Sequence, residues 1–238
     1  MQFIEYMEKY AVEFGLELSD KQLKMFDIYY QLLVEWNEKI NLTAITDPGE
    51  VAVKHMVDSL SVCDEKIINN SSKTIDVGTG AGFPGIPIKI MYPDMQLTLL
   101  DSLNKRVKFL QTVADKLDFR NIEIIHGRAE ELGKQKNYRG KYDVVFSRAV
   151  ARMPVLCEYA LPFVKIQGYF IALKGRQYEA EIAMAQNALK VLKASVDKIK
   201  SVKLPGLDDV RAIIYIKKTG KLPPMYPRKA GNPEKKPL

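Results

Sequence analysis

The stretch Thr74-Ile-Asp-Val-Gly-Thr-Gly-Ala-Gly-Phe-Pro-Gly85 decides the fold of this chain. A short β-branched run and an acid lead into a cluster of glycines, the pattern of a strand that turns into a ligand-binding loop. Glycines remove side chains where a ligand must approach the backbone or where the chain takes a positive φ. The cluster alone is ambiguous, because Gly80-Ala-Gly-Phe-Pro-Gly85 also satisfies the dinucleotide fingerprint G-x-G-x-x-G.

Acids near the ends of successive apolar runs narrow the choice of cofactor. Asp101 ends the run that starts at Leu97, nineteen residues after Gly82, where a carboxylate accepts hydrogen bonds from a ribose diol. That position suits both NAD and S-adenosyl-L-methionine (SAM). Asp76 precedes the glycines and suits an amino-acid ammonium better than a pyrophosphate, and Glu130 follows the third apolar run, where SAM-dependent enzymes usually recognise adenine. We therefore predict SAM as the cofactor, with a nicotinamide enzyme as the alternative.

Strands alternate with helical stretches from Thr74 onward, which predicts a doubly wound parallel sheet. Helices are expected at roughly 84–91, 103–117, 152–164 and 176–194. A fifth strand is expected at 169–173, and the last two strands at 198–204 and 211–217, the pair that class I methyltransferases insert antiparallel. The predicted fold class is α/β, a class I SAM-dependent methyltransferase with a Rossmann-like, seven-stranded, mostly parallel sheet and a helical N-terminal extension.

Three regions are predicted along the chain: a helical N-terminal extension at 1–72, a methyltransferase core at 73–217 and a basic, proline-rich C-terminal arm at 218–238. A capping box at Ser19-Asp-Lys-Gln22 opens a long amphipathic helix, and 50–68 reads as one further helix. The extension lacks a core of its own, so we expect it to pack on the methyltransferase core. The arm holds five prolines among cations, so an extended conformation is expected there.

The charge of the chain is unevenly distributed. The net charge is +7 overall, with −7 in residues 1–72, +8 in 73–216 and +6 in 217–238. A basic core and arm favour a polyanionic partner, and a solvated lysine-rich surface is the alternative. No opening apolar stretch resembles a signal peptide, and no apolar run approaches the ~18 residues that span a bilayer. Cys63 and Cys157 have no metal spacing. A cytoplasmic monomer without metal or membrane contact is expected.

The acceptor chemistry is inferred from motifs that the sequence lacks. Neither cysteine follows a proline, as a nucleophile for base-carbon methylation commonly does, and the fourth strand ends in Ser147-Arg-Ala-Val150 instead of the Pro-Pro-aromatic motif of amine methylation. These absences favour a lone-pair acceptor such as a purine ring nitrogen. Arg148 is expected where donor and acceptor meet, with a ligand-binding role favoured over a structural ion pair. Lys174, after the fifth strand, is expected to be a solvated edge lysine.

His55, Asp58 and Ser59 are spaced to share one helix face. They are either a catalytic cluster or, as we favour, residues whose local hydrogen bonds tie the helical extension to the glycine loop.

Several motifs together resemble one known family. They are Val34-Glu-Trp-Asn-Glu-Lys-Ile-Asn-Leu-Thr43, His55-x-x-Asp58-Ser-Leu60, Asp76-Val-Gly-Thr-Gly-Ala-Gly-Phe-Pro-Gly85, Asp101-Ser-Leu-Asn-Lys-Arg106, Ser147-Arg-Ala-Val-Ala-Arg152 and Tyr226-Pro-Arg-Lys229. Over essentially the whole chain, the sequence resembles the bacterial 16S ribosomal RNA guanine-N7 methyltransferase family, RsmG (GidB, glucose-inhibited division protein B).

The resemblance implies a reaction and a set of site residues. It implies methylation of guanosine N7 in a decoding-region hairpin loop of 16S ribosomal RNA, within naked RNA or the small ribosomal subunit. We predict Arg148 as the catalytic residue, with an aromatic near Phe83 stacking on the guanine. The predicted cofactor-binding residues are Asp76, Gly78, Gly80, Gly82, Phe83, Asp101, Ala129, Glu130 and Arg148. A non-catalytic RNA-binding or assembly protein with a vestigial fold is a further alternative.

Overall fold

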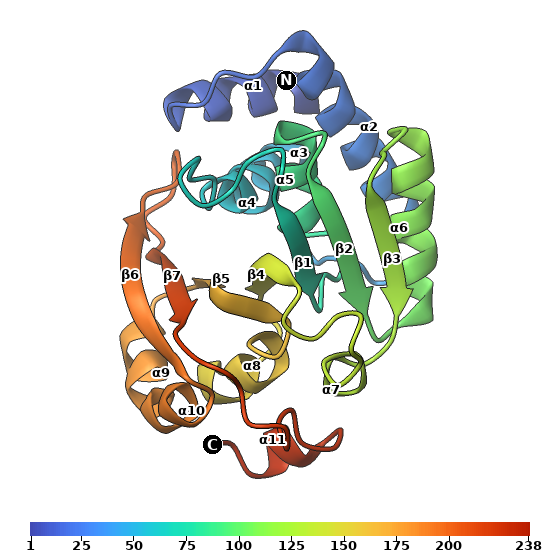
Figure 1. Cartoon of the computed structure of the whole chain (residues 1–238). Coiled ribbons are helices and arrows are strands. Elements are labelled where there is room, and N and C mark those ends of the chain that lie inside the picture. The colour runs from blue at the N-terminus through green and yellow to red at the C-terminus, as the bar shows by residue number, and fades with distance from the viewer.

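Seven strands form one sheet in the order β3-β2-β1-β4-β5-β7-β6 (Figure 1). The computed structural model describes residues 1–238. The strands are β1 (Lys73–Val77), β2 (Gln96–Asp101), β3 (Ile122–His126), β4 (Tyr142–Arg148), β5 (Val164–Lys174), β6 (Ala194–Val202) and β7 (Arg211–Lys218). Neighbours from β3 to β5 pair in parallel, and β7 is antiparallel to both β5 and β6. The predicted seven-stranded, mostly parallel α/β sheet is confirmed.

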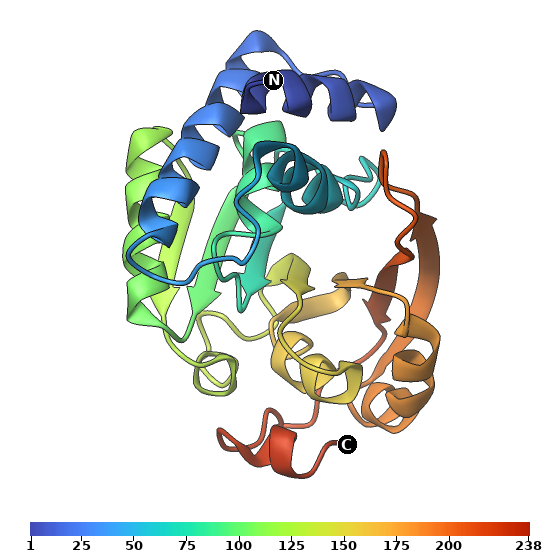
Figure 2. The ribbon, with the colours of Figure 1, turned by 180° about the vertical axis from the view of Figure 1, so that it is seen from behind.

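Helices cover both faces of the sheet (Figure 2). They are α1 (Phe3–Glu13), α2 (Asp20–Asn37), α3 (Pro48–Val51), the π-helix η1 (Ala52–Val57), α4 (Asp58–Leu60), α5 (Gly85–Met91), α6 (Asn104–Lys116), α7 (Ala129–Leu132), α8 (Met153–Ala160), α9 (Tyr178–Met184), α10 (Gln186–Val191) and α11 (Asn232–Lys235). None of them combines the length and the apolarity that a bilayer crossing requires.

Two predicted helices differ from the structure. The single helix predicted at 50–68 is a short composite of α3, η1 and α4 that ends at Leu60, and its middle turns are wound as a π-helix. The helix predicted at 176–194 is divided into α9 and α10. Lys193 takes a left-handed φ of 56°, which ends α10 and lets β6 begin at Ala194, four residues before the predicted start. Helical spacing of apolar residues does not reveal such interruptions.

The core lies in two layers, one on each face of the sheet. Neighbouring residues of a strand contribute to opposite layers: Val144 and Phe146 belong to the cluster under α2, α5 and α6, whereas Val145 belongs to the cluster under α8 and α10. A parallel strand buried on both faces must be apolar along its whole length. This explains why the strand motifs read as continuous apolar runs and not as alternating ones.

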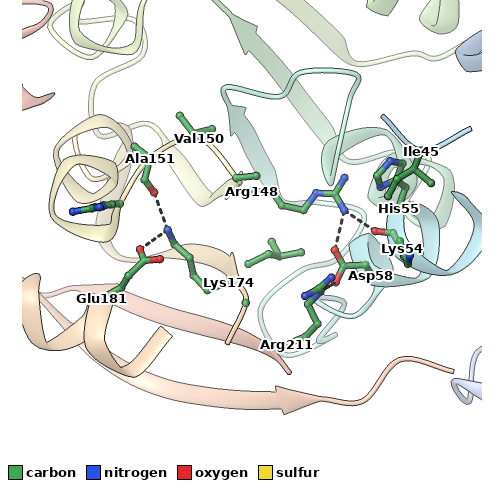
Figure 3. Close-up of a pocket in the computed structure, with 14 residues that line it drawn as sticks. Ile45, Lys54, His55, Asp58, Arg148, Val150, Ala151, Lys174, Glu181 and Arg211 are labelled. Atoms are coloured by element: carbon green, nitrogen blue, oxygen red, sulfur yellow. Dashed lines mark hydrogen bonds and ion pairs between the residues drawn. The ribbon is translucent and has the colours of Figure 1, made fainter. Parts of the chain in front are cut away.

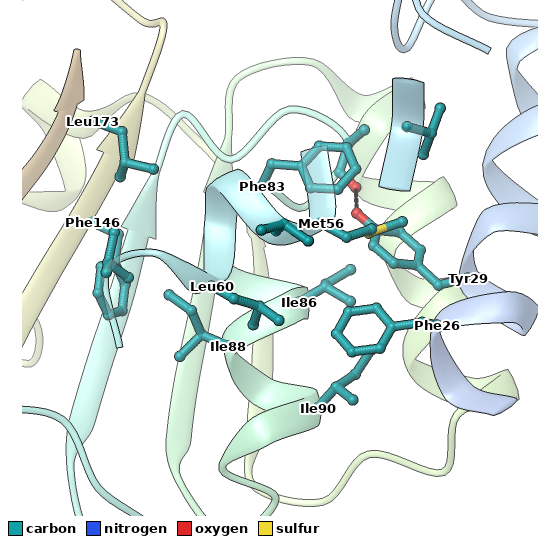
Figure 4. Packing of buried hydrophobic residues seen from close by; sticks show 14 of the residues in the cluster. Phe26, Tyr29, Met56, Leu60, Phe83, Ile86, Ile88, Ile90, Phe146 and Leu173 are labelled. Carbon is teal, nitrogen blue, oxygen red and sulfur yellow. Dashed lines mark hydrogen bonds between the residues drawn. The ribbon is translucent and has the colours of Figure 1, made fainter. Parts of the chain in front are cut away.

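The N-terminal helices pack into the first layer of this core. Phe26 and Tyr29 of α2 are fully buried and lie against Phe83, Ile86 and neighbouring apolar side chains (Figure 4). The hydroxyl of Tyr29 donates a 2.5 Å hydrogen bond to the carbonyl of Ala81 in the glycine loop. Residues 1–72 therefore share the core of the sheet, as expected for an extension without a core of its own.

The C-terminal residues do not form the predicted extended arm. They fold back along α7 and α8, bury Leu222, Pro227 and Pro233, and include the one-turn helix α11. Proline has no N–H, so its segment needs donors from elsewhere. Arg139 supplies them, because its guanidinium donates to the carbonyls of Pro223 and Tyr226 at 3.2 and 2.6 Å. The prediction failed because composition says nothing about such distant donors.

Candidate active site

Two pockets open where the strand order reverses between β1 and β4, the place where open α/β sheets bind ligands. The small pocket, of about 140 Å³, lies beyond β1 and β2 and is lined by Gly78, Asp101, Ala129 and Glu130, among others. The large pocket, of about 560 Å³, lies beyond β4 and β5, and Arg148 lines it (Figure 3). Val150 lines both pockets, so the two are neighbours.

Asp76 is the buried acid at the start of the glycine loop. Its Oδ2 accepts hydrogen bonds from the Thr79 hydroxyl at 2.7 Å and from the Gly85 N–H at 2.9 Å, whereas Oδ1 is buried without any partner. Burial is the main cause that raises the pKa of Asp76 to about 6, against the hydrogen bonds from Thr79 and Gly85, which lower it. A buried carboxylate oxygen without a partner is costly unless a ligand donates to it. The ammonium of an amino-acid cofactor fits this position.

The glycine loop favours glycine at Gly78 and Gly82 both because φ is positive and because a Cβ would clash with a neighbour. Gly78 has a φ of 70°, and a Cβ there would lie 2.5 Å from the Val150 side chain. Gly82 has a φ of 100°, and a Cβ there would lie 2.5 Å from Ile86. Gly80 also has a positive φ, but its Cβ would meet nothing. The loop is thus shaped both by left-handed backbone and by close packing under the β4 loop.

Asp101 lines the small pocket and also holds the glycine loop. Its Oδ2 accepts the Gly80 N–H at 2.8 Å, its Oδ1 accepts the Leu103 N–H at 2.9 Å, and Arg106 lies 3.6 Å away. An ionised carboxylate offers about four acceptor sites, so two remain for a diol. The bond to Gly80 was not predicted from the sequence.

Ala129 and Glu130 form the far side of the small pocket. Glu130 is 4% exposed, and its Oε1 accepts the backbone N–H of Gly231 at 3.3 Å. Asp101 and Glu130 line the small pocket, whereas Asp76, which is fully buried beneath the glycine loop, lines neither pocket. SAM carries a sulfonium and an ammonium, so these carboxylate acceptors fit it, and their negative charge would repel a pyrophosphate.

Arg148 ends β4 at the rim of the large pocket. Its Nη1 donates to Asp58 Oδ2 at 2.8 Å and to the Lys54 carbonyl at 3.2 Å (Figure 3). Its guanidinium carbon lies 4.9 Å from the centre of the Phe83 ring. The ion pair that we weighed against ligand binding is therefore present, but only Nη1 takes part in hydrogen bonds. Nη2 and Nε remain available to a ligand.

The Phe83 ring packs against the Arg148 guanidinium. The ring is 5% exposed and lies between His55, at 4.8 Å between ring centres, and Tyr29, at 5.4 Å. With Arg148 across it, the ring has little surface left for stacking on a base. Its contact with the cofactor remains a prediction.

The His55, Asp58 and Ser59 group makes local contacts of the kind that we favoured. His55 Nε2 lies 2.8 Å from the Thr43 hydroxyl, and the Ser59 hydroxyl donates to the His55 carbonyl. Burial and the charge of Arg148 lower the pKa of His55 to about 4. Asp58 connects the N-terminal extension to β4 through its ion pair with Arg148. The group contacts the glycine loop through the His55 ring, which packs on Phe83.

Lys174 is not the solvated edge lysine that we expected. It is 9% exposed, and its Nζ donates to the Ala151 carbonyl at 2.8 Å and to Glu181 Oε2 at 2.7 Å. The prediction failed because Glu181 of α9 and the Ala151 carbonyl lie against the Lys174 ammonium, and the residues next to Lys174 in sequence do not reveal these contacts. Lys174 instead fixes the loop after β4, in which Ala149 takes a left-handed φ of 56°.

Sequence reasoning missed two further residues at these pockets. Arg211 enters the large pocket from β7, with Nε 3.7 Å from Asp58 Oδ1, and no local motif announces it. Glu234 lines the small pocket from α11. In the sequence, the only indication of a role for Glu234 was that it is an acidic residue among the basic residues of the C-terminal region.

Comparisons with known proteins agree with this geometry. Residues 22–210 match the family model GidB, described as rRNA small subunit methyltransferase G. The ribosomal RNA small subunit methyltransferase G of Thermoanaerobacter pseudethanolicus is 50% identical over 99% of this chain and 98% of its own. The enzyme of the same name from Streptococcus agalactiae is 51% identical over 95% and 96%. Among solved structures, M. jannaschii TYW2 in complex with AdoMet superposes with a TM-score of 0.51 at 15% identity, covering 64% of this chain and 71% of that one.

Proposed function

This chain belongs to the rRNA small subunit methyltransferase G family, and on that premise we propose that it methylates N7 of a guanosine in the decoding-region loop of 16S ribosomal RNA. SAM supplies an activated methyl group for an in-line displacement. The protein then has to hold the two reactants in line and to favour the charge changes of the transfer.

One observation carries the proposal: a small pocket whose charged residues are mainly acids adjoins, at Val150, a large pocket whose charged residues are mainly cations. The large pocket is lined by the cations Lys54, Arg148, Arg152, Lys174 and Arg211 and by the acids Asp58 and Glu181, so cations exceed acids there by three even though several of them are paired. Acids suit the cationic cofactor, and cations suit the phosphates of an RNA loop. The volume of about 560 Å³ lies within the roughly 300–1,000 Å³ of typical ligand sites.

The cofactor roles follow from the positions of the acids. Asp76 would accept the ammonium of the methionine part through Oδ1, the oxygen without a partner. Asp101 would accept the ribose hydroxyls, and Ala129 with Glu130 would bind the adenine. The glycine loop, braced by the hydrogen bond from Gly80 to Asp101, lets the methionine part approach the backbone.

The acceptor requires positioning more than acid–base catalysis. N7 of guanine has a free lone pair, so no proton has to be removed before it attacks the methyl carbon. His55, with a pKa of about 4, is neutral at physiological pH and has no role as a proton donor in this proposal. Arg148 would use Nη2 or Nε to hold the guanine O6, a phosphate or the cofactor carboxylate, while Asp58 fixes Nη1.

The experiment is to map the methyl group in ribosomal RNA. RNA from cells with and without this protein is reduced and cleaved with aniline, which breaks the chain at N7-methylguanosine, and the cut is located by primer extension. A cut in the decoding-region loop that requires the protein supports the proposal. Methyl incorporation without aniline sensitivity would refute N7 as the acceptor. Purified protein on naked 16S RNA and on small subunits then distinguishes the two substrate forms.

Arg148 is tested by substitution with a matched control. Arg120 is an exposed arginine next to the start of β3, at the opposite end of the strands, and has no ion pair. Arg148→Ala should lose methylation of 16S RNA while Arg120→Ala keeps it. Equal activities of the two variants would contradict the proposed role of Arg148.

A further inference from the structure

The C-terminal residues reach the small pocket. Glu234 of α11 lines it together with Tyr159 and Glu130. We propose that residues 222–235, here called the C-terminal clasp, are a structural part of the cofactor site that positions Glu130 and closes the adenosine end. The inference rests on SAM occupying the small pocket, as proposed above.

The clasp is anchored by a buried ion pair. Glu158 of α8 is 0% exposed, and its carboxylate accepts from Arg228 at three points: the backbone N–H at 2.7 Å, Nε at 2.9 Å and Nη2 at 2.6 Å. A bidentate arginine with a carboxylate is among the strongest side-chain contacts in proteins. The two carbonyls held by Arg139 add a second anchor. The segment is thus docked by specific bonds and not by charge alone.

Two bonds connect the docked clasp to the pocket. The Gly231 N–H donates to Glu130 Oε1 at 3.3 Å, which leaves Oε2 for a ligand. The Tyr159 hydroxyl donates to Glu234 Oε1 at 3.1 Å, which holds a further carboxylate at the pocket wall. Adenine has an exocyclic amine that donates hydrogen bonds, so oriented carboxylates at this end suit it. Undocking the clasp would remove one wall and free Glu130 to rotate.

The alternative is that the basic C-terminal region binds RNA directly. Arg228 is already committed to Glu158, so its charge is not free for phosphate. Lys221, just before the clasp, is exposed and makes no ion pair. The two cations therefore make a matched pair of variants: each loses one positive charge, but only one substitution undocks the clasp.

The experiment compares Arg228→Gln with Lys221→Gln by calorimetry on the full chain. The ligands are SAM and 5′-methylthioadenosine, which shares the adenosine end but lacks the amino acid. We expect Arg228→Gln to weaken both ligands by about tenfold, because a misplaced wall costs on the order of one charge-assisted hydrogen bond. Lys221→Gln should bind both as the unchanged protein does. Unchanged binding by Arg228→Gln, with weaker binding of 16S RNA, would overturn the inference.

If Arg228→Gln does not fold, a variant with a smaller change tests the same proposal. Tyr159→Phe keeps the packing and removes only the hydroxyl that holds Glu234, so it should weaken both ligands severalfold and leave the melting temperature nearly unchanged. Wild-type affinity for both ligands in this variant would also count against the clasp. The outcome is separable from the proposed reaction: clasp variants with normal cofactor affinity in a protein that makes the aniline-sensitive site refute the clasp alone.

Discussion

Lowering the pH from 7 to 5 should weaken SAM binding about tenfold through Asp76. Burial raises the pKa of this carboxyl to about 6. Of the two nearby charges, Arg148 lowers this pKa and Asp101 raises it. Only the ionised carboxylate attracts the cofactor ammonium strongly. At pH 5, one unit below the pKa, roughly a tenth of the protein carries that charge, so the apparent affinity falls by about tenfold.

The direction of the pH effect on SAM affinity depends on which protonation state of Asp76 the ligand binds. SAM binds the ionised carboxylate, so below pH 6 its binding must release a proton, and the effect must vanish well above pH 6. The same raised pKa acts on folding without ligand. Because the folded pKa exceeds the unfolded value, the contribution of Asp76 to stability is complete below about pH 4 and is lost as the pH rises through 6.

Calorimetry at pH 7, 6 and 5, in buffers of different ionisation enthalpy, measures both the affinity and the released proton. Asp76→Asn keeps the size of the side chain and removes the titration, so this variant should bind SAM weakly and with the same affinity at all three values. An affinity of the unchanged protein that varies less than twofold between pH 7 and 5, without proton release, would refute the role of Asp76 Oδ1 as the ammonium acceptor.

Three further outcomes are expected. Arg148→Ala should lower kcat/KM for 16S RNA by ~100-fold and Asp58→Asn by nearer tenfold, since the first removes the positioning group and the second only its support; equal losses in single-turnover assays would contradict this order. Asp101→Ala should weaken SAM by roughly 1–3 kcal/mol and increase hydrogen exchange at the glycine loop, and calorimetry with exchange measurements checks both. Arg228→Ala should destabilise folding by ~3 kcal/mol because it strands the buried Glu158 carboxylate, and adding Glu158→Gln should restore part of that loss in urea unfolding.

The parts of this protein that could be predicted from sequence are those with local causes. The positions of the parallel strands along the chain and of the acids at their ends follow from short runs of side chains, because burial on both faces requires continuous apolar strands. The placement of Asp76, Asp101 and Glu130 at one edge follows from the same rule, since parallel strands end on the same side. Their partners along the glycine loop, such as the Thr79 hydroxyl, depend on turn geometry within a few residues.

The parts that could not be predicted depend on contacts between distant segments. Lys174 is predicted to be solvated until Glu181 of α9 and the Ala151 carbonyl are known to lie against its ammonium. The C-terminal region was predicted to be an extended arm because no local pattern shows that Arg139 and Glu158, far away in sequence, form hydrogen bonds with it. Asp58 and Arg148 are 90 residues apart, and neither has a neighbour in sequence that indicates the other.

The hydrogen bond from Tyr29 to the Ala81 carbonyl bears on whether this architecture is modular. A polypeptide cut at residue 72 would keep every acid of the small pocket, yet the carbonyl of Ala81 would lose its donor, and α5 would expose the apolar face that α2 covers. Burial raises the pKa of Tyr29 well above that of free tyrosine, so the donor stays protonated at any pH the fold survives. The N-terminal helices thus cannot be exchanged between methyltransferase cores like a detachable recognition domain; a chimaera must carry the tyrosine and its loop together.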